Sequence, residues 1–163
     1  MRGNKLKLVI LTALISAMCV LGSFIKIPSV ITTVALDSAP AFISAAFLPP
    51  MFAGMVGALG HVATGLTSGF PLGPLHILIA VEMLVIVYMF ALLHQKGHHR
   101  LKWVFALLAN GVISAVPLIF IFSFEFAIAA VPGLFIGTLI NLIVCAIVMP
   151  VVIKAVSRVK VMD

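Results

Sequence analysis

Few side chains in this sequence can do chemistry, and nearly all of them interrupt long apolar runs. They are two carboxylates, two imidazoles and two amides: Asp37, His61, His76, Glu82, Asn110 and Asn141. Ionisable groups are costly inside a bilayer, so each one predicts a functional site. The alternative for each is a hydrogen bond that only holds two helices together. Because most of the set falls in the outer half of its apolar run, we expect a polar cavity that opens outward.

The third apolar run has the most regular pattern. Gly54, Gly57, His61, Thr64 and Ser68 follow one another at spacings of three and four residues, the period of one helix face. The inner half of this face carries glycine, and the outer half carries polar side chains. The pattern predicts a tightly packed helix whose outer end borders the cavity.

Aromatic residues lie near the same predicted end of the molecule. Phe70 follows the third run, and Phe122 and Phe124 flank the turn after the fifth. A cavity with such walls suits a small ligand that has a flat apolar part and hydroxyl groups.

Other motifs point away from catalysis, metals and cofactors. His94, His98 and His99 lie in a basic loop without a carboxylate or thiolate to complete a metal site, and Cys19 and Cys145 lie in apolar runs as packing residues. The sequence has no nucleophile elbow, phosphate-binding loop or HExxH motif. We therefore expect no enzyme activity, no cofactor and no ATP site. An intramembrane enzyme and a small assembly subunit remain as alternatives.

The composition predicts the kind of elements that position these residues. Hydrophobic residues make up 64% of the chain and charged residues 9%, compared with about 25% charged in soluble domains, and the mean hydropathy is +1.35. Such a chain needs lipid as its solvent. We expect one all-α membrane domain over residues 1–163 with six transmembrane helices. The predicted spans are 6–24, 31–48, 51–66, 75–93, 104–122 and 126–153.

The basic residues predict the orientation. Most of them fall before the first span, between the fourth and fifth, or after the sixth, and only Lys26 falls on the other side. The positive-inside rule then places both termini on the cytoplasmic side of the membrane. The net charge of +6 reflects this topology and not a nucleic-acid partner. For the first span the alternative is a cleaved signal peptide, but no soluble domain follows it.

Two pairs of small residues could let another helix approach closely. Ala13 and Ala17 lie four residues apart in the first span, and Gly133 and Gly137 have the same spacing in the sixth. Either pair could face a partner protein or pack within the bundle.

With these features the chain resembles the substrate-binding S-components of energy-coupling factor (ECF) transporters of bacteria. The resemblance covers the whole chain, including the Ala13-x-x-x-Ala17 pair, which is similar to the AxxxA docking pattern of that family. Residues 34–40 and 60–73, followed by His76 and Glu82, look most like the members assigned to α-ribazole, a cobamide precursor. Nickel and cobalt members begin with a Met-His pair, whereas Arg2 follows Met1 here.

The resemblance implies a subunit that captures a vitamin-like ligand from outside. Import would then require a transmembrane coupling subunit, docked at Ala13 and Ala17, and two cytoplasmic ATPases. Riboflavin, pantothenate, hydroxymethylpyrimidine or thiamine, and a queuosine precursor remain as alternative ligands. The predicted ligand-binding set is Asp37, His61, Thr64, Ser68, Phe70, His76, Glu82, Asn110 and Asn141.

For α-ribazole, these residue types suggest specific roles. Asp37, Glu82 or Asn141 would hydrogen-bond the ribose hydroxyls. One of the two histidines would contact the ring nitrogen, and Phe70 would stack on the dimethylbenzimidazole.

Overall fold

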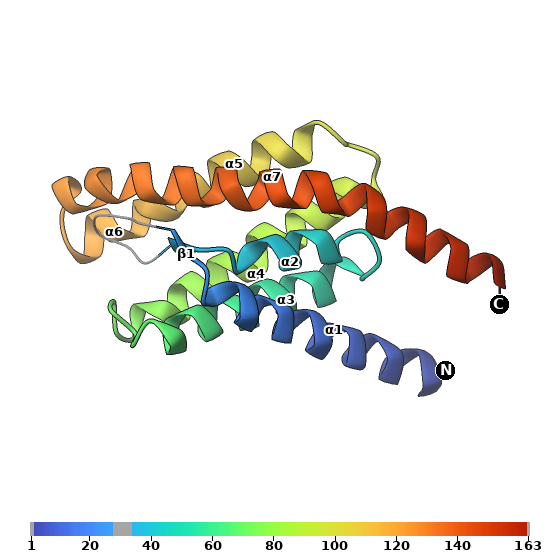
Figure 1. Ribbon diagram of the computed structural model, residues 1–163. Coiled ribbons are helices and arrows are strands. Elements are labelled where there is room, and N and C mark those ends of the chain that lie inside the picture. Colours follow the sequence, from blue (N-terminus) through green and yellow to red (C-terminus); the bar gives the residue numbers. More distant parts are fainter. Residues whose placement is uncertain (1, 28–33, 163) are drawn as a thin grey trace.

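A computed structural model describes residues 2–27 and 34–162 of the chain, which is mostly helical (Figure 1). Its elements in order are α1 (Arg2–Ser23), β1 (Lys26–Ile27), β2 (Val34–Ala35), α2 (Ser38–Ser44), α3 (Pro50–Thr67), α4 (Leu75–Gln95), α5 (Leu101–Gly111), the 3-10 helix η1 (Ile113–Ala115), α6 (Val116–Ile121) and α7 (Phe124–Met162).

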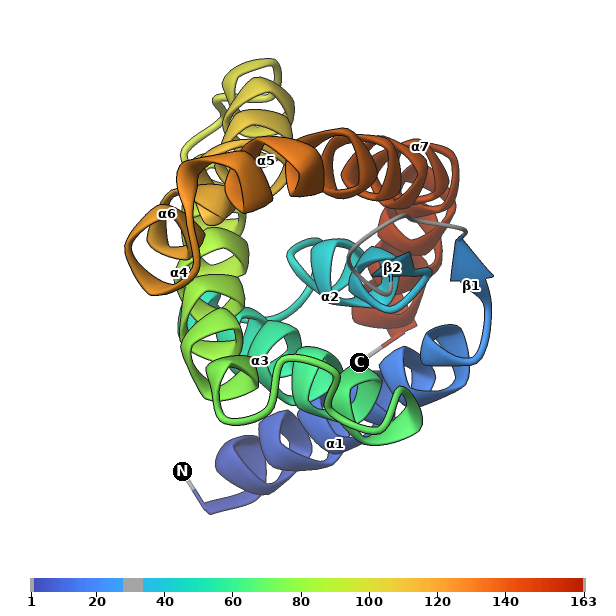
Figure 2. The same ribbon diagram turned by 90° about the vertical axis from the view of Figure 1, so that its left-hand side faces the viewer.

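The helices run side by side along the long axis of the molecule. The start of α1, the end of α7 and the α4–α5 connection lie at one end, called here the termini end (Figure 1). The hairpin of β1 and β2, the α3–α4 loop and the α6–α7 connection lie at the other, called here the loop end. Seen along this axis, the long helices surround α2 (Figure 2). Accordingly Ala41, Phe42 and Ser44 of α2 are fully buried.

The second predicted span is not one continuous helix. Within the described part, 34–48, the chain forms strand β2, the short helix α2 and a turn before Pro49, while residues 31–33 lie outside the description. Pro40 explains the late start, because its ring would clash with a helix arriving from upstream but is tolerated in a first turn. The prediction of a helix over 31–48 was therefore wrong, and β1 pairs antiparallel with β2 instead.

The fifth predicted span, 104–122, is also divided. Helix α5 ends at Gly111, and η1 and α6 continue the segment. Pro117 lies at the start of α6, where its missing amide hydrogen costs little. The hydroxyl of Ser114 donates to the Asn110 carbonyl at 2.6 Å, which satisfies one backbone acceptor beside the break.

The polar segment between the fourth and fifth spans is shorter than predicted. His94 belongs to the last turn of α4 and Lys102 to the first turn of α5. Lys102 is only 3% exposed, and its Nζ donates to His94 Nδ1 at 2.8 Å and to Met149 Sδ at 3.3 Å. Its ammonium also lies over the rings of Phe90 and Trp103, so it joins α4, α5 and α7 at the termini end.

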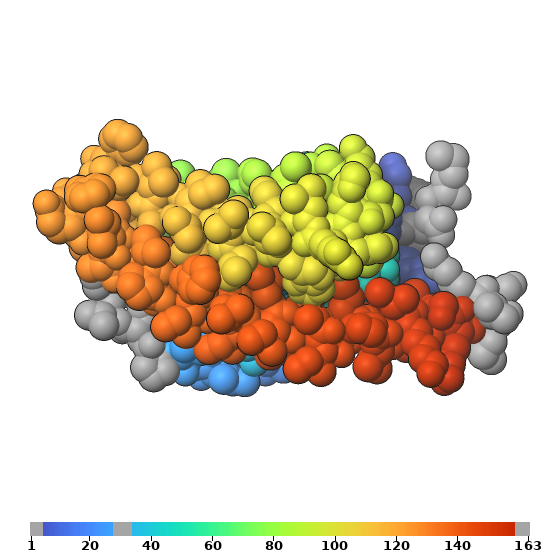
Figure 3. All heavy atoms as spheres, turned by 90° about the horizontal axis from the view of Figure 1, so that it is seen from above, coloured from blue at the N-terminus to red at the C-terminus, as the bar shows by residue number. Residues whose placement is uncertain are grey.

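Within the described residues, four stretches are long and apolar enough to cross a membrane: Lys5–Ser23, Leu75–Gln95, Leu101–Ile121 and Phe124–Arg158. Helix α3 has 18 residues and packs among them, whereas α2 has only 7. Figure 3 shows a long face formed by α5, α6 and α7. The exposed apolar side chains of α6 and α7 include Phe120, Ile136, Ile147 and Val151. These surfaces fit contact with lipid, as expected for a helical membrane protein.

The glycines of α3 set its distance from α4. A Cβ at Gly57 would lie 2.7 Å from Val87 Cγ2 and 2.9 Å from the Met83 carbonyl oxygen, and one at Gly54 would lie 2.7 Å from the Leu84 carbonyl oxygen. The two backbones therefore approach too closely for any other residue at these positions. This contact fixes the wall that carries His61 and Glu82.

Candidate ligand-binding site

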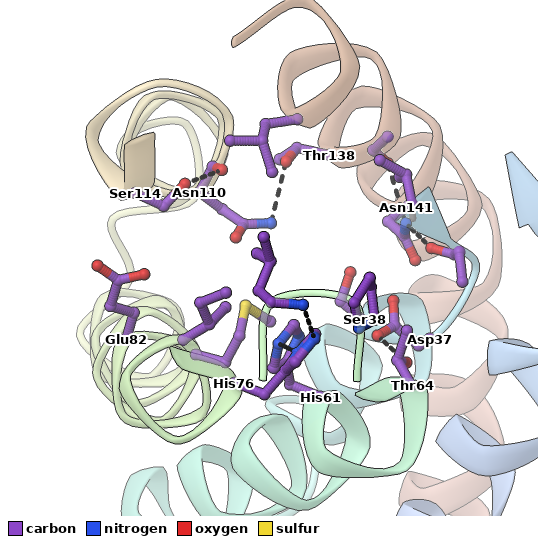
Figure 4. Close-up of a pocket in the computed structure, with 18 of the residues that line it drawn as sticks. Asp37, Ser38, His61, Thr64, His76, Glu82, Asn110, Ser114, Thr138 and Asn141 are labelled. Carbon is purple, nitrogen blue, oxygen red and sulfur yellow. Dashed lines mark hydrogen bonds between the residues drawn. The ribbon is translucent and has the colours of Figure 1, made fainter. Parts of the chain in front are cut away.

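A cavity lies among the helices toward the loop end. Its volume is about 100 Å³, which is smaller than the about 300–1,000 Å³ of sites that enclose drug-sized ligands. Its polar lining residues come from α2, α3, α4, α5, η1 and α7 and from the residue before α2 (Figure 4): Asp37, Ser38, His61, Thr64, His76, Glu82, Asn110, Ser114, Thr138 and Asn141.

One wall carries a carboxylate held by a threonine. Asp37 directly precedes α2, and its Oδ2 accepts a hydrogen bond from Thr64 Oγ1 on α3. Thr64 is buried and also lies 3.2 Å from the Gly60 carbonyl oxygen. The aspartate therefore links the start of α2 to the polar face of α3.

The two histidines of the cavity form a pair. His61 Nε2 and His76 Nδ1 are 3.1 Å apart, and the rings stack with centroids at 5.3 Å. The Leu72 amide donates to His76 Nε2 at 3.5 Å, so this nitrogen is an acceptor. We assign the proton of His76 to Nδ1 on this basis, which makes His61 Nε2 the next acceptor. The remaining nitrogen, His61 Nδ1, then carries a proton that it can donate.

Glu82 lies on the side of the cavity opposite Asp37 (Figure 4). Its Oε2 is buried and has no hydrogen-bond partner among the residues that the structure describes. A buried polar atom without a partner is unfavourable, so this oxygen is available to a hydrogen-bond donor such as a ligand hydroxyl.

The two amides of the cavity differ in their bonding. Asn141 is fully paired with backbone groups: its Oδ1 accepts from Ala39 N at 2.7 Å, and its Nδ2 donates to Ala35 O and Gly137 O. Its main role is therefore to fasten β2 and α2 to α7. Asn110 uses only Nδ2, which donates to Thr138 Oγ1 at 2.9 Å.

Most of the residues predicted from the sequence come together here, but two lie outside the lining. Ser68 accepts from Lys26 Nζ at 2.7 Å on the exposed rim. Phe70 has a positive φ of 50° and packs edge-on against His76, with ring centroids 5.4 Å apart. This position places its ring beside the histidine pair and not on the cavity wall.

The sequence analysis missed three polar lining residues, Ser38, Ser114 and Thr138. Thr138 lies three residues before Asn141, and Ser114 lies four after Asn110, so helical spacing from the predicted amides could have found both. The apolar part of the lining comes from residues such as Ile79, Met83, Leu118 and Leu134.

The two small-residue pairs face different surroundings. Ala13 and Ala17 are exposed on α1, next to the exposed Leu14. Gly137 is buried against the Val34 side chain. The α7 pair therefore contributes to packing inside the bundle, and the α1 pair stays open to a partner.

Among the residues that the structure describes, no group of three His, Cys, Asp or Glu side chains is placed to hold a metal ion. The site is instead a mainly apolar cavity with two carboxylates, an imidazole donor and an amide oxygen. Such groups can bind a small solute that offers several hydrogen bonds and an apolar ring.

Comparison with known proteins identifies the family. The family model described as "ECF transporter, substrate-specific component" matches residues 7–154. Comparisons with curated proteins and with solved structures return no match. Members of this family are transport subunits that bind substrate and work with an ECF module. Since the match spans most of the sequence, the chain belongs to the family of ECF transporter substrate-specific components.

Proposed function

We propose that this protein captures α-ribazole, a cobamide precursor, from outside a bacterial cell for ATP-driven uptake. The observation that carries the proposal is the cavity toward the loop end, where polar groups and an apolar wall meet. The alternatives are another vitamin or precursor, namely riboflavin, pantothenate, hydroxymethylpyrimidine or thiamine, or a queuosine precursor.

The cavity offers complementary groups for both halves of α-ribazole. Asp37 and Glu82 would accept hydrogen bonds from ribose hydroxyls. His61 would donate from Nδ1 to the ring nitrogen, because both nitrogens of His76 already have partners. The dimethylbenzimidazole would lie against apolar residues such as Leu118 and Leu134. Phe70 would stack on this ring only after turning away from His76.

The distribution of charge supports an outward-facing cavity. Lys96 and Arg100 lie in the α4–α5 connection at the termini end, whereas Lys26 is at the loop end. With the positive-inside rule, this charge difference supports a cytoplasmic location for both termini and an outward-facing mouth of the cavity.

Uptake requires partners that supply energy, because the sequence has no nucleotide-binding motif. The exposed pair Ala13 and Ala17 on α1 would receive a helix of the transmembrane coupling subunit. Two cytoplasmic ATPases would complete the importer.

Calorimetric titration of the purified full-length protein with α-ribazole tests the ligand. We expect saturable binding at one site, and at least tenfold weaker binding for Asp37→Ala and for Glu82→Ala. Glu125→Ala is the matched control, because this carboxylate is exposed at the start of α7 and does not line the cavity. Wild-type affinity in both cavity variants contradicts the site.

Native mass spectrometry of gently purified protein separates the remaining functions. A retained α-ribazole supports the proposal, and the mass of another retained solute identifies the substrate. If α-ribazole is added to the protein, an intramembrane enzyme would convert it. Recovery of unchanged α-ribazole therefore argues against that alternative.

A further inference from the structure

The cavity has negative groups but no positive ones. Asp37 and Glu82 line it, and no Lys or Arg does in the described part of the chain. Residues 28–33, next to β2, carry no charged side chain in the sequence either. The lining therefore offers no fixed cation to an anionic ligand.

The spacing of basic residues in the sequence also indicates that no Lys or Arg is available to the cavity, whatever the side-chain positions. No Lys or Arg occurs between Lys26 and Lys96, or between Lys102 and Lys154. Lys26 is the basic residue at the loop end, and it is exposed. Its Nζ donates to Thr67 Oγ1 at 3.2 Å and to Ser68 Oγ at 2.7 Å, so it is engaged on the rim.

Helix N-termini are the other common sites for anions, because their first amides are free. Here the amides of Leu75, His76 and Ile77 at the start of α4 donate to carbonyls of the preceding loop at 3.0–3.3 Å. At the start of α2, the Ala39 amide donates to Asn141. These amides are therefore already occupied.

The histidines do not replace the missing cation. They share one hydrogen bond, 3.1 Å long, and His76 Nε2 also accepts from Leu72. This arrangement requires His76 to be neutral. Protonation of both rings would break the hydrogen bond between them. What Glu82 lacks is a donor, because its Oε2 is buried without a partner among the described residues.

From these observations we infer that the cavity selects solutes without negative charge, neutral or cationic, that donate a hydrogen bond to Glu82, and rejects their phosphorylated or carboxylated analogues. This inference rests on the proposed function, since it takes the cavity as the substrate site. It disfavours pantothenate, a carboxylate, among the alternative ligands. An anion would enter a partly buried site beside two carboxyl groups, with no Lys or Arg in the described lining, which is an arrangement that proteins use against a wrong ligand.

Matched pairs of probes test the selection on purified full-length protein. The pairs are α-ribazole, riboflavin and thiamine, each with its monophosphate, and pantothenate is added as a carboxylate. We expect at least one unphosphorylated probe to bind and its monophosphate to bind at least 100-fold more weakly. Comparable binding of any monophosphate, binding of pantothenate, or no binding by all three unphosphorylated probes overturns the inference.

A second measurement assigns the selection to Glu82. Glu82→Gln keeps the size of the side chain and removes its charge, so the preference for the unphosphorylated probe should narrow at least tenfold. Glu125→Gln makes the same charge change on the exposed start of α7 and should leave the preference unchanged. An unchanged preference in Glu82→Gln, or an equal change in both variants, contradicts the role of Glu82.

The two proposals can fail separately. Binding of riboflavin or thiamine with rejection of its monophosphate refutes α-ribazole as the ligand but supports the charge selection. Equal binding of α-ribazole and its 5′-phosphate supports the ligand and refutes the selection.

Discussion

Each polar residue of the cavity either positions another side chain, fastens backbone segments together or is available to a ligand. Thr64 belongs to the first kind, because its hydroxyl donates to Asp37. Asn141 belongs to the second, and Glu82, with its unpaired oxygen, to the third. The three kinds predict different results when the residues are changed.

Thr64→Val should weaken ligand binding without unfolding the protein. Valine has the shape of threonine but cannot donate to Asp37, so the carboxylate loses a bond worth about 1.5–3 kcal/mol and its fixed orientation. We expect about tenfold lower affinity for α-ribazole by calorimetric titration. Thr64→Ser keeps the hydroxyl and should bind nearly as the wild type does. Equal affinity in the valine and serine variants contradicts the positioning role.

Asn141→Leu should reduce stability more than any other change in the cavity. The substitution leaves the Ala39 amide and the Ala35 carbonyl without their partner in a buried site. Each lost partner costs about 1–3 kcal/mol, so the free energy of unfolding should fall by about 3 kcal/mol. Thermal unfolding in detergent, followed by circular dichroism, measures this.

Asn110→Leu is the comparison, since Asn110 makes one side-chain bond, to a threonine hydroxyl that can rotate to another partner. Its loss of stability should be clearly smaller. A larger loss in Asn110→Leu would show that Asn141 is not the principal fastening residue.

At the scale of residues, the sequence predicted which residue types meet at the cavity, but not what each one does there. Asp37, His61 and Glu82 were recognisable because ionisable groups are costly in apolar runs. The division between ligand contact and backbone fastening was not, because it depends on which partners the fold provides. Phe70 illustrates this limit: its place after α3 suggested a cavity wall, but its positive φ turns the ring onto His76.

At the scale of elements, hydropathy predicted the long helices well and the short ones poorly. The predicted spans 75–93 and 6–24 agree with α4 and α1 within a few residues. The run 31–48 is also apolar, but Pro40 and Asp37 delay its helix to Ser38. This late start matters for the site, because it places the Asp37 carboxylate at the start of a buried helix and not along its side.

The contact of α3 with α4 gives a prediction at this scale. Gly57→Ala puts a methyl group within 2.7–2.9 Å of Val87 and the Met83 carbonyl, so α4 must shift. Overpacking of this kind costs about 1–3 kcal/mol. It should lower the unfolding temperature, and it should also weaken ligand binding because Glu82 moves with α4.

Ala129→Val provides the control, because Ala129 is exposed on α7 and has room for added methyl groups. Both measurements should stay near the wild-type values in this variant. If Gly57→Ala behaves in the same way, α3 and α4 are not held at the distance that the structure gives.

At the scale of the whole molecule, the two ends differ in rigidity and in charge. The termini end is filled by the packed rings of Phe42, Phe90 and Trp103 and closed by Lys102. The loop end contains the cavity and the rim residue Lys26. The proposed function therefore assigns binding and energy coupling to different surfaces, the cavity for the ligand and the exposed side of α1 for the partner.

This separation predicts variants that bind ligand but do not support uptake. Ala13→Leu and Ala17→Leu enlarge side chains that are exposed on α1 and do not line the cavity, so affinity for α-ribazole should stay within twofold of the wild type. A close helix contact cannot accommodate leucine at both positions, so co-purification with the coupling subunit and the ATPases should be lost. Ala146→Leu makes the same change on the exposed side of α7 and should preserve both ligand affinity and co-purification with the partner subunits. The partner would lie on another surface if Ala146→Leu also lost uptake, or if the protein with both α1 residues changed still formed a stable complex. Only a contact at Ala13 and Ala17 predicts that the two α1 variants lose the complex while Ala146→Leu keeps it.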